Sequence, residues 1–310
     1  MDWLKDDPLV AAYLADCEIR GMSPRSFPGY HSALRAFLKY LNEKDVPLLS
    51  VGQNELIDFI RYLRLERQVA QRTIELTFSV LSSLYEYLIF SGHLEVNPVL
   101  PVRKRYLKRY KDNGDHNERQ LISVENMTRL INSTLDIRDK AIITLLAKTG
   151  IRRNELISLD VADVDFVEQK IRLKPTAKRS NRTVFFDDEC SFILRRWLKS
   201  REGMNKKRSP ALFLGIEGDR LQRRGVSDVV YKAGARVGLH DPESKRCEDH
   251  FSPHCMRHWN TTFLLRAGMK REYVQWLRGD AIKEAVDIYF HVDPKDVQEA
   301  YLAAIPQLGI

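Results

Sequence analysis

Residues 254–258 of this 310-residue chain are His-Cys-Met-Arg-His, and Ser252-Pro253 stands immediately before them. A serine followed by a proline is typical of the first positions of a helix, so we expect a helix that begins here and ends near Gly268. On that helix His254 and Arg257 are three residues apart and share one face. Free backbone N–H groups and the helix dipole favour an anion at its N-terminus. The segment therefore predicts an anion site that combines a titratable imidazole with a permanent cation.

Other segments supply side chains for the same chemistry. Residues 149–156 are Thr-Gly-Ile-Arg-Arg-Asn-Glu-Leu, residues 277–280 are Leu-Arg-Gly-Asp, and a tyrosine follows nine residues after Asp280. Two guanidiniums can neutralise phosphate oxygens as a metal ion would, a tyrosine can attack the phosphorus, and a lysine can protonate the leaving oxygen. The candidate residues for a metal-free phosphoryl transfer are therefore Arg152, His254, Arg257 and Tyr289.

A zinc site is the competing interpretation of the same region. Two cysteines and three histidines lie within twelve residues, at Cys247, His250, His254, Cys255 and His258. Their spacing argues against zinc, because adjacent residues of a helix point in different directions and no second Cys-x-x-Cys pair completes a tetrahedral set. We expect no metal and no other cofactor.

Hydrophobic periodicity divides the chain into two parts. In the first hundred residues, apolar side chains recur at helical spacing over 8–19, 30–41, 56–63 and 74–90, with Ser23-Pro24 as the expected start of the second helix. Further along the chain, helices are expected over 136–148, 154–159, 187–201, 253–267 and 294–304. Two short strands are expected at 170–173 and 183–186.

These patterns predict a mostly α fold with a small β-sheet. We expect a helical domain without catalytic chemistry over residues 1–102 and a basic linker over residues 103–118. A mixed α/β catalytic domain is expected over residues 119–310.

The charge of the chain is unevenly distributed. There are 50 Lys+Arg against 42 Asp+Glu, a formal net charge of +8, and six of the nine residues at 103–111 are cations. A basic run releases counterions when it lies along a phosphate backbone, although a solvated linker explains it as well. Its position after Asn97-Pro98 favours a domain boundary. We therefore expect nucleic acid as the partner. The candidate nucleic-acid contacts are Arg103, Lys104, Arg105, Lys108, Arg109, Lys111, Arg179 and Arg182.

Composition excludes several other classes of protein. No apolar run approaches the ~20 residues that a membrane span needs, and the acidic N-terminus lacks the apolar core of a signal peptide. The four cysteines form no evenly spaced framework, which indicates a reducing compartment. We expect a cytoplasmic, nucleoid-associated protein.

The motifs, taken in this order, resemble the tyrosine recombinases, also called the phage integrase family, over nearly the whole chain. Residues 23–30 and 92–98 resemble the family's helical core-binding domain. Residues 149–156 resemble the box of its first catalytic arginine, and residues 254–258 resemble its His-x-x-Arg-His box. The resemblance implies that fold and implies catalytic roles for the four candidate residues. The Leu-Arg-Gly-Asp segment is similar to integrases of archaeal mobile elements.

Two positions match the family less closely. Its catalytic lysine lies in the turn between two strands, which implies Lys178, with Lys174 on the preceding strand as the alternative. Asp280 stands where the family usually has a histidine or tryptophan that touches the phosphate. A carboxylate beside a phosphate is repulsive unless it is protonated or paired. We expect Asp280 either to pair with or orient a nearby arginine, or to act only as a helix cap.

The resemblance implies a reaction in which Tyr289 attacks a DNA phosphate, forming a 3′-phosphotyrosyl bond and freeing a 5′-hydroxyl. Arg152 and Arg257 would stabilise the transition state, and His254 would act as acid/base or phosphate ligand. Lys178 would protonate the leaving oxygen. Because the ester keeps the bond energy, neither ATP nor a metal is implied.

The resemblance also implies an assembly of four protomers on two duplexes. We expect the C-terminal segment, residues 296–310, to dock on a neighbouring protomer, with packing on its own domain as the alternative. Two rival functions remain, a type IB topoisomerase-like nicking-closing enzyme and a DNA-binding relative that has lost catalysis. Asp280 is the feature that supports the second.

Overall fold

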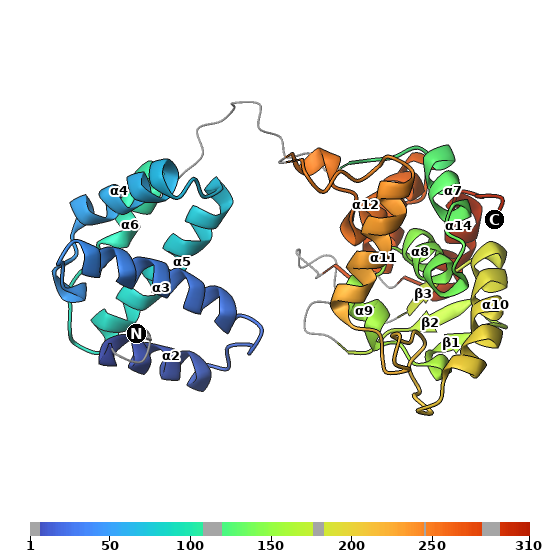
Figure 1. Cartoon of the computed structure of the whole chain (residues 1–310), viewed down its shortest axis with the longest axis horizontal. Coiled ribbons are helices and arrows are strands. Elements are labelled where there is room, and N and C mark those ends of the chain that lie inside the picture. Colours follow the sequence, from blue (N-terminus) through green and yellow to red (C-terminus); the bar gives the residue numbers. More distant parts are fainter. Residues whose placement is uncertain (1–6, 108–119, 176–182, 245, 281–291) are drawn as a thin grey trace. The chain divides into compact units, whose positions relative to one another are not determined.

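The computed structural model describes residues 7–107, 120–175, 183–244, 246–280 and 292–310. The chain divides into two compact units, Met1–Asp115 and His116–Ile310, and each has a hydrophobic core of its own (Figure 1). The prediction of a mostly α fold with a small β-sheet is confirmed.

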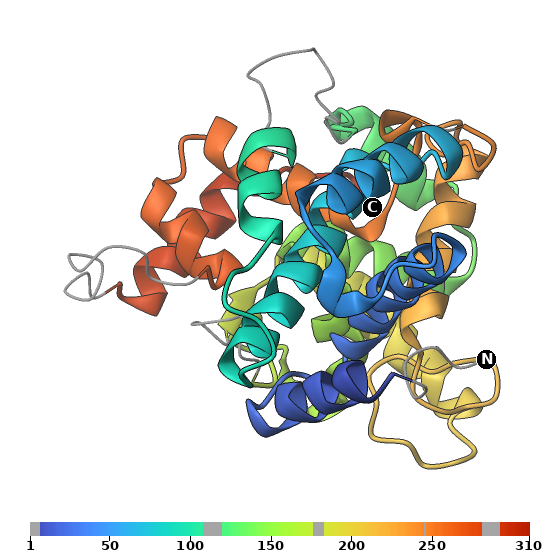
Figure 2. The same cartoon turned by 90° about the vertical axis from the view of Figure 1, so that its left-hand side faces the viewer.

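The described residues of the first unit are helical. Its helices are α2 (Pro8–Ile19), α3 (Phe27–Glu43), α4 (Gln53–Arg61), α5 (Gln71–Phe90) and α6 (Val99–Val102), with the short 3₁₀-helix η1 (Leu48–Ser50) and the short π-helices η2 (Tyr62–Glu66) and η3 (Arg103–Leu107). Helix α5 is central because it packs on α2, α3 and α6, and Figure 2 shows the unit turned by 90°. On α5 the buried Tyr85 hydroxyl donates to the Leu48 carbonyl at 2.9 Å, so the polar end of this ring is satisfied inside the core.

Helix α3 starts later than the sequence predicts. The expected start is Ser23-Pro24, but the helix begins at Phe27 and has Pro28 in its first turn. The residues before it form a turn in which the Ser26 N–H donates to the Ser23 carbonyl at 2.8 Å. Ser-Pro pairs initiate turns as well as helices, so the local pattern is compatible with both starts.

The first unit continues past residue 102, where the sequence predicts the linker. The π-helix η3 follows α6 directly, and its Leu107 is buried in the core of the first unit. Nη2 of Arg103 donates to Oγ of Ser79 on α5 at 3.0 Å. Residues 103–107 therefore belong to the helical unit, and the remainder of the expected linker lies outside the described residues.

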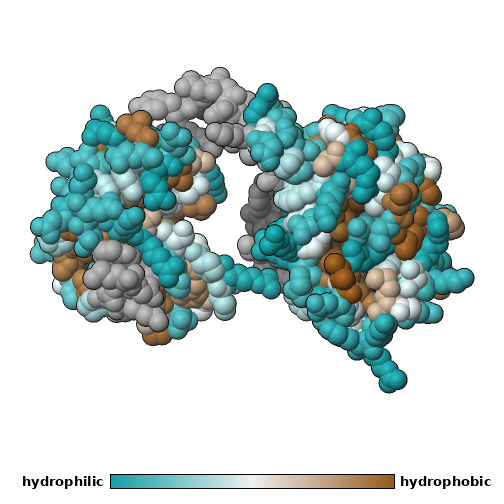
Figure 3. Space-filling model, in the orientation of Figure 1, coloured by the Kyte–Doolittle hydropathy of each residue, from teal (hydrophilic) through white to brown (hydrophobic). Residues whose placement is uncertain are grey.

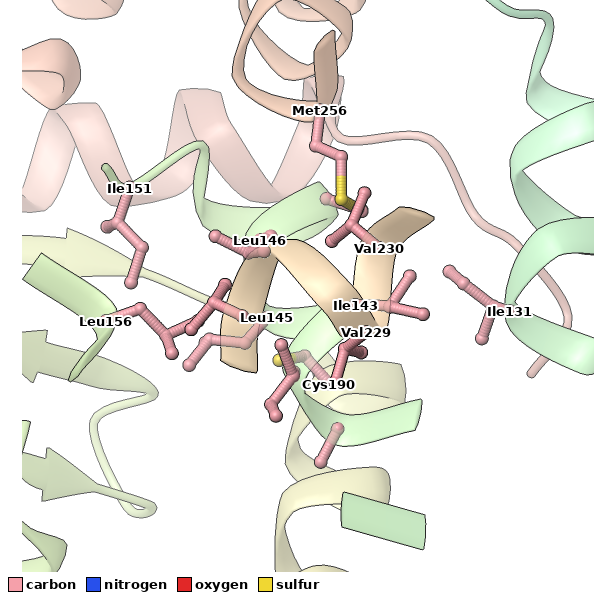
Figure 4. Close-up of a cluster of buried hydrophobic side chains, with 14 of the residues drawn as sticks. Ile131, Ile143, Leu145, Leu146, Ile151, Leu156, Cys190, Val229, Val230 and Met256 are labelled. Carbon is pink, nitrogen blue, oxygen red and sulfur yellow. The ribbon is translucent and has the colours of Figure 1, made fainter. Parts of the chain in front are cut away.

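The second unit is organised around helix α8 (Ile137–Thr149). Residues 141–149 of this helix are all buried, as expected for a helix enclosed by others. The helices that pack on it are α7 (Val124–Asn132), α10 (Asp188–Met204), α11 (Arg223–Arg236) and α12 (Pro253–Arg266). Figure 4 shows part of this core, where Leu146 of α8 lies near Val230 of α11 and Met256 of α12. The remaining helices are α9 (Arg153–Ser158), α13 (Arg271–Arg278) and α14 (Pro294–Ala304).

The sheet of the second unit has three short antiparallel strands. They are β1 (Val164–Asp165), β2 (Lys170–Arg172) and β3 (Thr183–Phe185), hydrogen-bonded in that order. Ile171 of β2 lies opposite Val184 of β3, and both side chains are buried. Both predicted strands are present. The sequence did not predict β1, whose two residues are too few to show an alternating pattern.

The C-terminal segment packs on its own unit. Leu308 is buried in the core, and its N–H donates to the Glu189 carboxylate at 2.9 Å. The Pro306 carbonyl accepts a hydrogen bond from Nζ of Lys148 at 2.8 Å. This is the arrangement that the sequence analysis kept as the alternative. Docking of the segment on a neighbouring protomer stays a prediction.

The surface carries no large apolar band on the face drawn in Figure 3. Each unit is mostly hydrophilic there, and its hydrophobic residues form small separate patches, which is ordinary for folded domains. Among the described residues, no helix is both long enough and apolar enough to cross a membrane.

Candidate active site

The candidate site begins where α8 ends. Gly150 adopts a left-handed conformation with φ of +60° and closes the helix, as glycine commonly does at this position. A Cβ at Gly150 would lie 2.6 Å from Oδ1 of Asn260, so the close approach of α12 also requires glycine. The Asn260 amide donates to the carbonyls of Ala147 and Lys148 at 3.0 and 2.8 Å. The end of α8 is thereby fastened to α12.

Arg152 follows this turn and caps the next helix, α9. Its backbone N–H donates to Oε2 of Glu155 at 2.7 Å, and its Nη1 donates to Oε1 of the same carboxylate at 3.1 Å. Glu155 is 3% exposed, whereas the Arg152 side chain is 36% exposed. A buried carboxylate thus anchors one edge of the guanidinium and leaves it able to meet an external anion.

Helix α12 supplies the second guanidinium. Pro253 occupies its first turn, where the missing N–H of proline costs nothing. His254 lies exposed in that turn, and Arg257 follows one turn later and is buried. Nη1 of Arg257 donates to the Gly150 carbonyl at 2.7 Å, and its Nη2 donates to the Arg278 carbonyl at 3.0 Å. Arg257 is therefore held between the end of α8 and the end of α13.

Asp280 joins the two guanidiniums. One of its oxygens, Oδ1, lies 3.8 Å from Nη2 of Arg152 and 3.8 Å from Nη2 of Arg257. Its other oxygen, Oδ2, lies 2.7 Å from Nε of Arg278. The prediction that Asp280 pairs with a nearby arginine is consistent with these distances, whereas a helix cap alone would not explain the contacts with residues from two other helices.

This arrangement is suited to binding an anion. The two guanidiniums come from sequence positions about a hundred residues apart, and both are within ion-pair distance of one carboxylate oxygen. Arg152 and Asp280 are each about one third exposed, so an external phosphate can reach them. A planar guanidinium can donate two parallel hydrogen bonds to two oxygens of one phosphate.

Several predicted residues lie outside the described part of the chain. They are Tyr289, Lys178, Arg179, Arg182, Lys108, Arg109 and Lys111. Their proposed roles stay predictions. Arg103, Lys104 and Arg105 are described, and the first two line a hollow on the first unit together with Arg72 and Ser79.

Lys174, the alternative to Lys178, is described and is engaged elsewhere. Its Nζ lies 3.0 Å from carboxylate oxygens of both Asp160 and Asp163. The hydrogen bond to Asp160, followed by that to Asp163, raises the pKa of Lys174 above its ordinary value. A lysine whose charged form is stabilised in this way is a weaker proton donor.

Three residues that hold this frame together were not predicted from the sequence. Glu155, Asn260 and Arg278 each support one of the site arginines or the turn before it. Glu155 had a readable signal, because a Glu three residues after a helix start is typical of a capping box. The other two act only through tertiary contacts. Across the described residues, no group of three metal-ligating side chains comes together.

Comparison with protein families identifies the fold. The model of the phage integrase family matches residues 117–296, and the model of the phage integrase N-terminal SAM-like domain matches residues 9–90. The chain belongs to the phage integrase family. The family prediction made from the three motifs is thereby confirmed, while its narrower form, a branch found in archaeal mobile elements, stays a prediction.

Curated relatives of this phage integrase family member span its length. The tyrosine recombinase XerC of Haemophilus influenzae (strain ATCC 51907 / DSM 11121 / KW20 / Rd) is 28% identical over 292 residues, which is 93% of each chain. The XerC of Corynebacterium glutamicum is 34% identical over 171 residues, covering 55% of this chain and 52% of that protein.

Solved structures of integrases share the fold. The Tn1549 transposon integrase, in complex with transposon right end DNA, has a TM-score of 0.68 at 18% identity and covers 94% of this chain and 97% of its own. A lambda integrase dimer bound to a COC′ core site has a TM-score of 0.68 at 16% identity and covers 89% of this chain and 97% of its own.

Proposed function

We propose that this phage integrase family member is a site-specific DNA recombinase that cuts and rejoins strands through a 3′-phosphotyrosyl intermediate. The observation that carries the proposal is the meeting of Arg152 and Arg257 on one carboxylate oxygen at a partly exposed site. Two guanidiniums converging on one accessible point provide what a phosphoryl transfer requires, which is stabilisation of charge on the phosphate oxygens.

The arrangement of Arg152 and Arg257 and the family motifs support the proposed roles, which for Tyr289 and Lys178 rest on the motifs alone. Arg152 and Arg257 would hold the non-bridging oxygens of the scissile phosphate. The exposed His254, in the first turn of α12, would bind the phosphate or act as an acid/base. Tyr289 would attack the phosphorus and release the 5′-hydroxyl. We assign the proton donor to Lys178, since Lys174 is already engaged by two carboxylates.

Double-stranded DNA is the proposed substrate of the assembled protein. The SAM-like match of the first unit and the cations of η3 support DNA binding there. A lambda integrase of the same fold is described as a tetramer bound to a Holliday junction, and we propose a homotetramer on paired sites for this chain. A protein with this task acts in the cytoplasm, at the nucleoid. Bond energy kept in the tyrosyl ester removes the need for ATP, and the two guanidiniums would stabilise the charge on the phosphate oxygens in place of a metal.

The test begins with a DNA site obtained by selecting bound duplexes from a random library. A nicked version of that duplex, in which the cut strand end can diffuse away, is incubated with the protein in EDTA and run on a denaturing gel. We expect a covalent protein–DNA band from wild type and none from Tyr289→Phe. Tyr273→Phe is the matched control, because Tyr273 is a partly buried tyrosine on α13 that packs in a hydrophobic cluster.

Each other outcome contradicts a defined part of the proposal. A band that survives in Tyr289→Phe assigns the nucleophile to another tyrosine. Selected binding without any covalent band favours the DNA-binding relative that has lost catalysis. Relaxation of a supercoiled plasmid that lacks the selected site favours the nicking-closing enzyme.

A further inference from the structure

Asp280 is held in place by the backbone at the end of α13. Gly279 adopts a left-handed conformation with φ of +61° and ends the helix. The N–H of Asp280 then donates to the Gln275 carbonyl at 3.3 Å. This is the hydrogen-bonded turn that commonly closes helices at glycine. The end of α13 therefore fixes the backbone position from which the Asp280 side chain extends.

The two oxygens of Asp280 have different environments. Oδ2 is close to Arg278, at 2.7 Å from Nε. Oδ1 is equally far, at 3.8 Å, from a nitrogen of Arg152 and a nitrogen of Arg257. The longer distances are those of ion pairs without good hydrogen bonds, since charge-assisted N–H···O contacts are about 2.7–2.9 Å long. Oδ1 of Asp280 therefore lies within ion-pair distance of both arginines, but beyond the length of a good hydrogen bond to either nitrogen.

A negative charge at this point has a clear electrostatic effect. Two guanidiniums held near one another repel, and the repulsion is stronger where burial lowers the effective dielectric. The Arg257 side chain is only 8% exposed, so a nearby negative charge stabilises its cationic form more than it would at the surface. One carboxylate oxygen between two arginines also occupies the position that an oxygen of a bound phosphate would take.

We propose that Asp280 is a positioning residue, an internal anion that keeps Arg152 and Arg257 directed at one point until a phosphate displaces it. The inference rests on the proposed function for the identity of that phosphate, the scissile phosphate of DNA. When the phosphate arrives, Oδ1 leaves the arginine pair while Oδ2 keeps its contact with Arg278. The carboxylate therefore competes with the substrate. A variant with a neutral side chain of equal size at residue 280 should bind phosphate at the arginine pair more tightly than wild type does.

The experiment compares wild type with Asp280→Asn, with inorganic phosphate as the probe and sodium chloride at constant ionic strength. Thermal unfolding of the full chain is followed over a phosphate titration. Asp219→Asn is the control, because it removes the same charge from a residue that is exposed and pairs with Lys207. Arg152→Gln combined with Asp280→Asn reports whether the anion binds at the arginine pair.

The expected result has two parts. Without phosphate, Asp280→Asn melts below wild type and below Asp219→Asn, because the arginines have lost their counter-charge. Phosphate then raises the melting temperature of Asp280→Asn more than that of wild type. The apparent Kd for phosphate falls about tenfold, which corresponds to about 1.4 kcal/mol. Adding Arg152→Gln removes this gain.

Other results overturn the inference. Equal or weaker phosphate affinity in Asp280→Asn means that the carboxylate does not compete for the site. A loss of stability that phosphate does not restore means that Asp280 is only a helix cap. If the affinity for phosphate increases as much in Asp219→Asn as in Asp280→Asn, the change in net charge alone explains the effect.

The same titration separates this inference from the proposed function. In a Tyr289→Phe background no tyrosyl ester can form at that residue, yet the phosphate response is expected to persist. If covalent DNA is never observed while the phosphate response holds, the anion site stands and the recombinase assignment falls. If covalent DNA forms but the phosphate response is absent, only the role of Asp280 is refuted.

Discussion

Replacing Lys148 by methionine tests how the second unit is held together. This lysine is on α8, has 0% exposure, and donates from Nζ to Asp187 and Glu189 at 2.5 Å each. A third acceptor is the Pro306 carbonyl of the C-terminal segment, at 2.8 Å. Methionine fills a similar volume, so Lys148→Met removes the charge and the three hydrogen bonds while leaving little cavity.

The loss of stability in Lys148→Met comes from the two acidic side chains that lose their common partner. Two carboxylates would be left side by side in a region where they are at most 14% exposed. Removing one partner of a buried ion pair costs about 3–5 kcal/mol. Glu189 still accepts the Leu308 N–H, which favours the lower end of that range. We expect Lys148→Met to lower the free energy of unfolding by about 3 kcal/mol, or about 6–12 °C in melting temperature for a unit of this size.

Tryptophan fluorescence during urea denaturation measures this change. Three of the four tryptophans, at residues 197, 259 and 276, lie in the second unit, so the signal reports mainly on it. A double-mutant cycle with Glu189→Gln isolates the pair, and we expect the double variant to be less destabilised than the sum by about 1–2 kcal/mol. Lys207→Met is the control, since its ion pair with Asp219 is about half exposed and contributes at most about 1 kcal/mol.

Two results would refute the reasoning. One is a Lys148→Met variant no less stable than Lys207→Met, which would mean that the buried lysine is not needed as a counter-charge. The other is strict additivity in the cycle with Glu189→Gln, which would mean that the two side chains do not stabilise one another in the folded chain.

Three further predictions concern the same structure. Burial raises the pKa of Glu189, but the hydrogen bonds from Lys148 and the Leu308 N–H outweigh it and leave the pKa below its ordinary value of 4.5. Its ionised form therefore contributes stability above about pH 4.5, and this stability is lost as the pH falls through the lower folded pKa. The difference in melting temperature between wild type and Glu189→Gln should therefore shrink in acid. A difference that stays constant down to about pH 3 would contradict this. Gly150→Ala should lower the free energy of unfolding, measured by urea denaturation, by at least about 2 kcal/mol. The added Cβ would occupy a left-handed backbone position and would lie 2.6 Å from Oδ1 of Asn260. A change below about 0.5 kcal/mol would contradict that geometry. Lys178→Ala should slow covalent-complex formation by about 10²-fold or more while Lys174→Ala stays within a few-fold, and the reverse order would assign the proton donor to Lys174.

Local sequence signals determined much of the secondary structure. Helix α2 spans the predicted residues 8–19, and Asp136 caps α8 next to its predicted start. Both patterns depend on neighbours within one or two turns, which a sequence displays directly. No bounds were predicted for α7, α11 and α13, although the apolar residues of α7 at Met127, Leu130 and Ile131 recur at helical spacing.

The candidate residues were identified by sequence, but their arrangement was decided by the tertiary structure. The motifs indicated Arg152, Arg257 and Asp280, and all three lie within the residues that the phage integrase family model matches. Their convergence depends on α8 ending at Gly150 against α12, and on α13 ending beside them. The same holds for Lys148, whose partners lie 39 to 158 residues away. Short-range preferences select helices and turns, whereas the pairing of buried charges depends on packing between segments far apart in the chain, and only the folded structure brings those segments together.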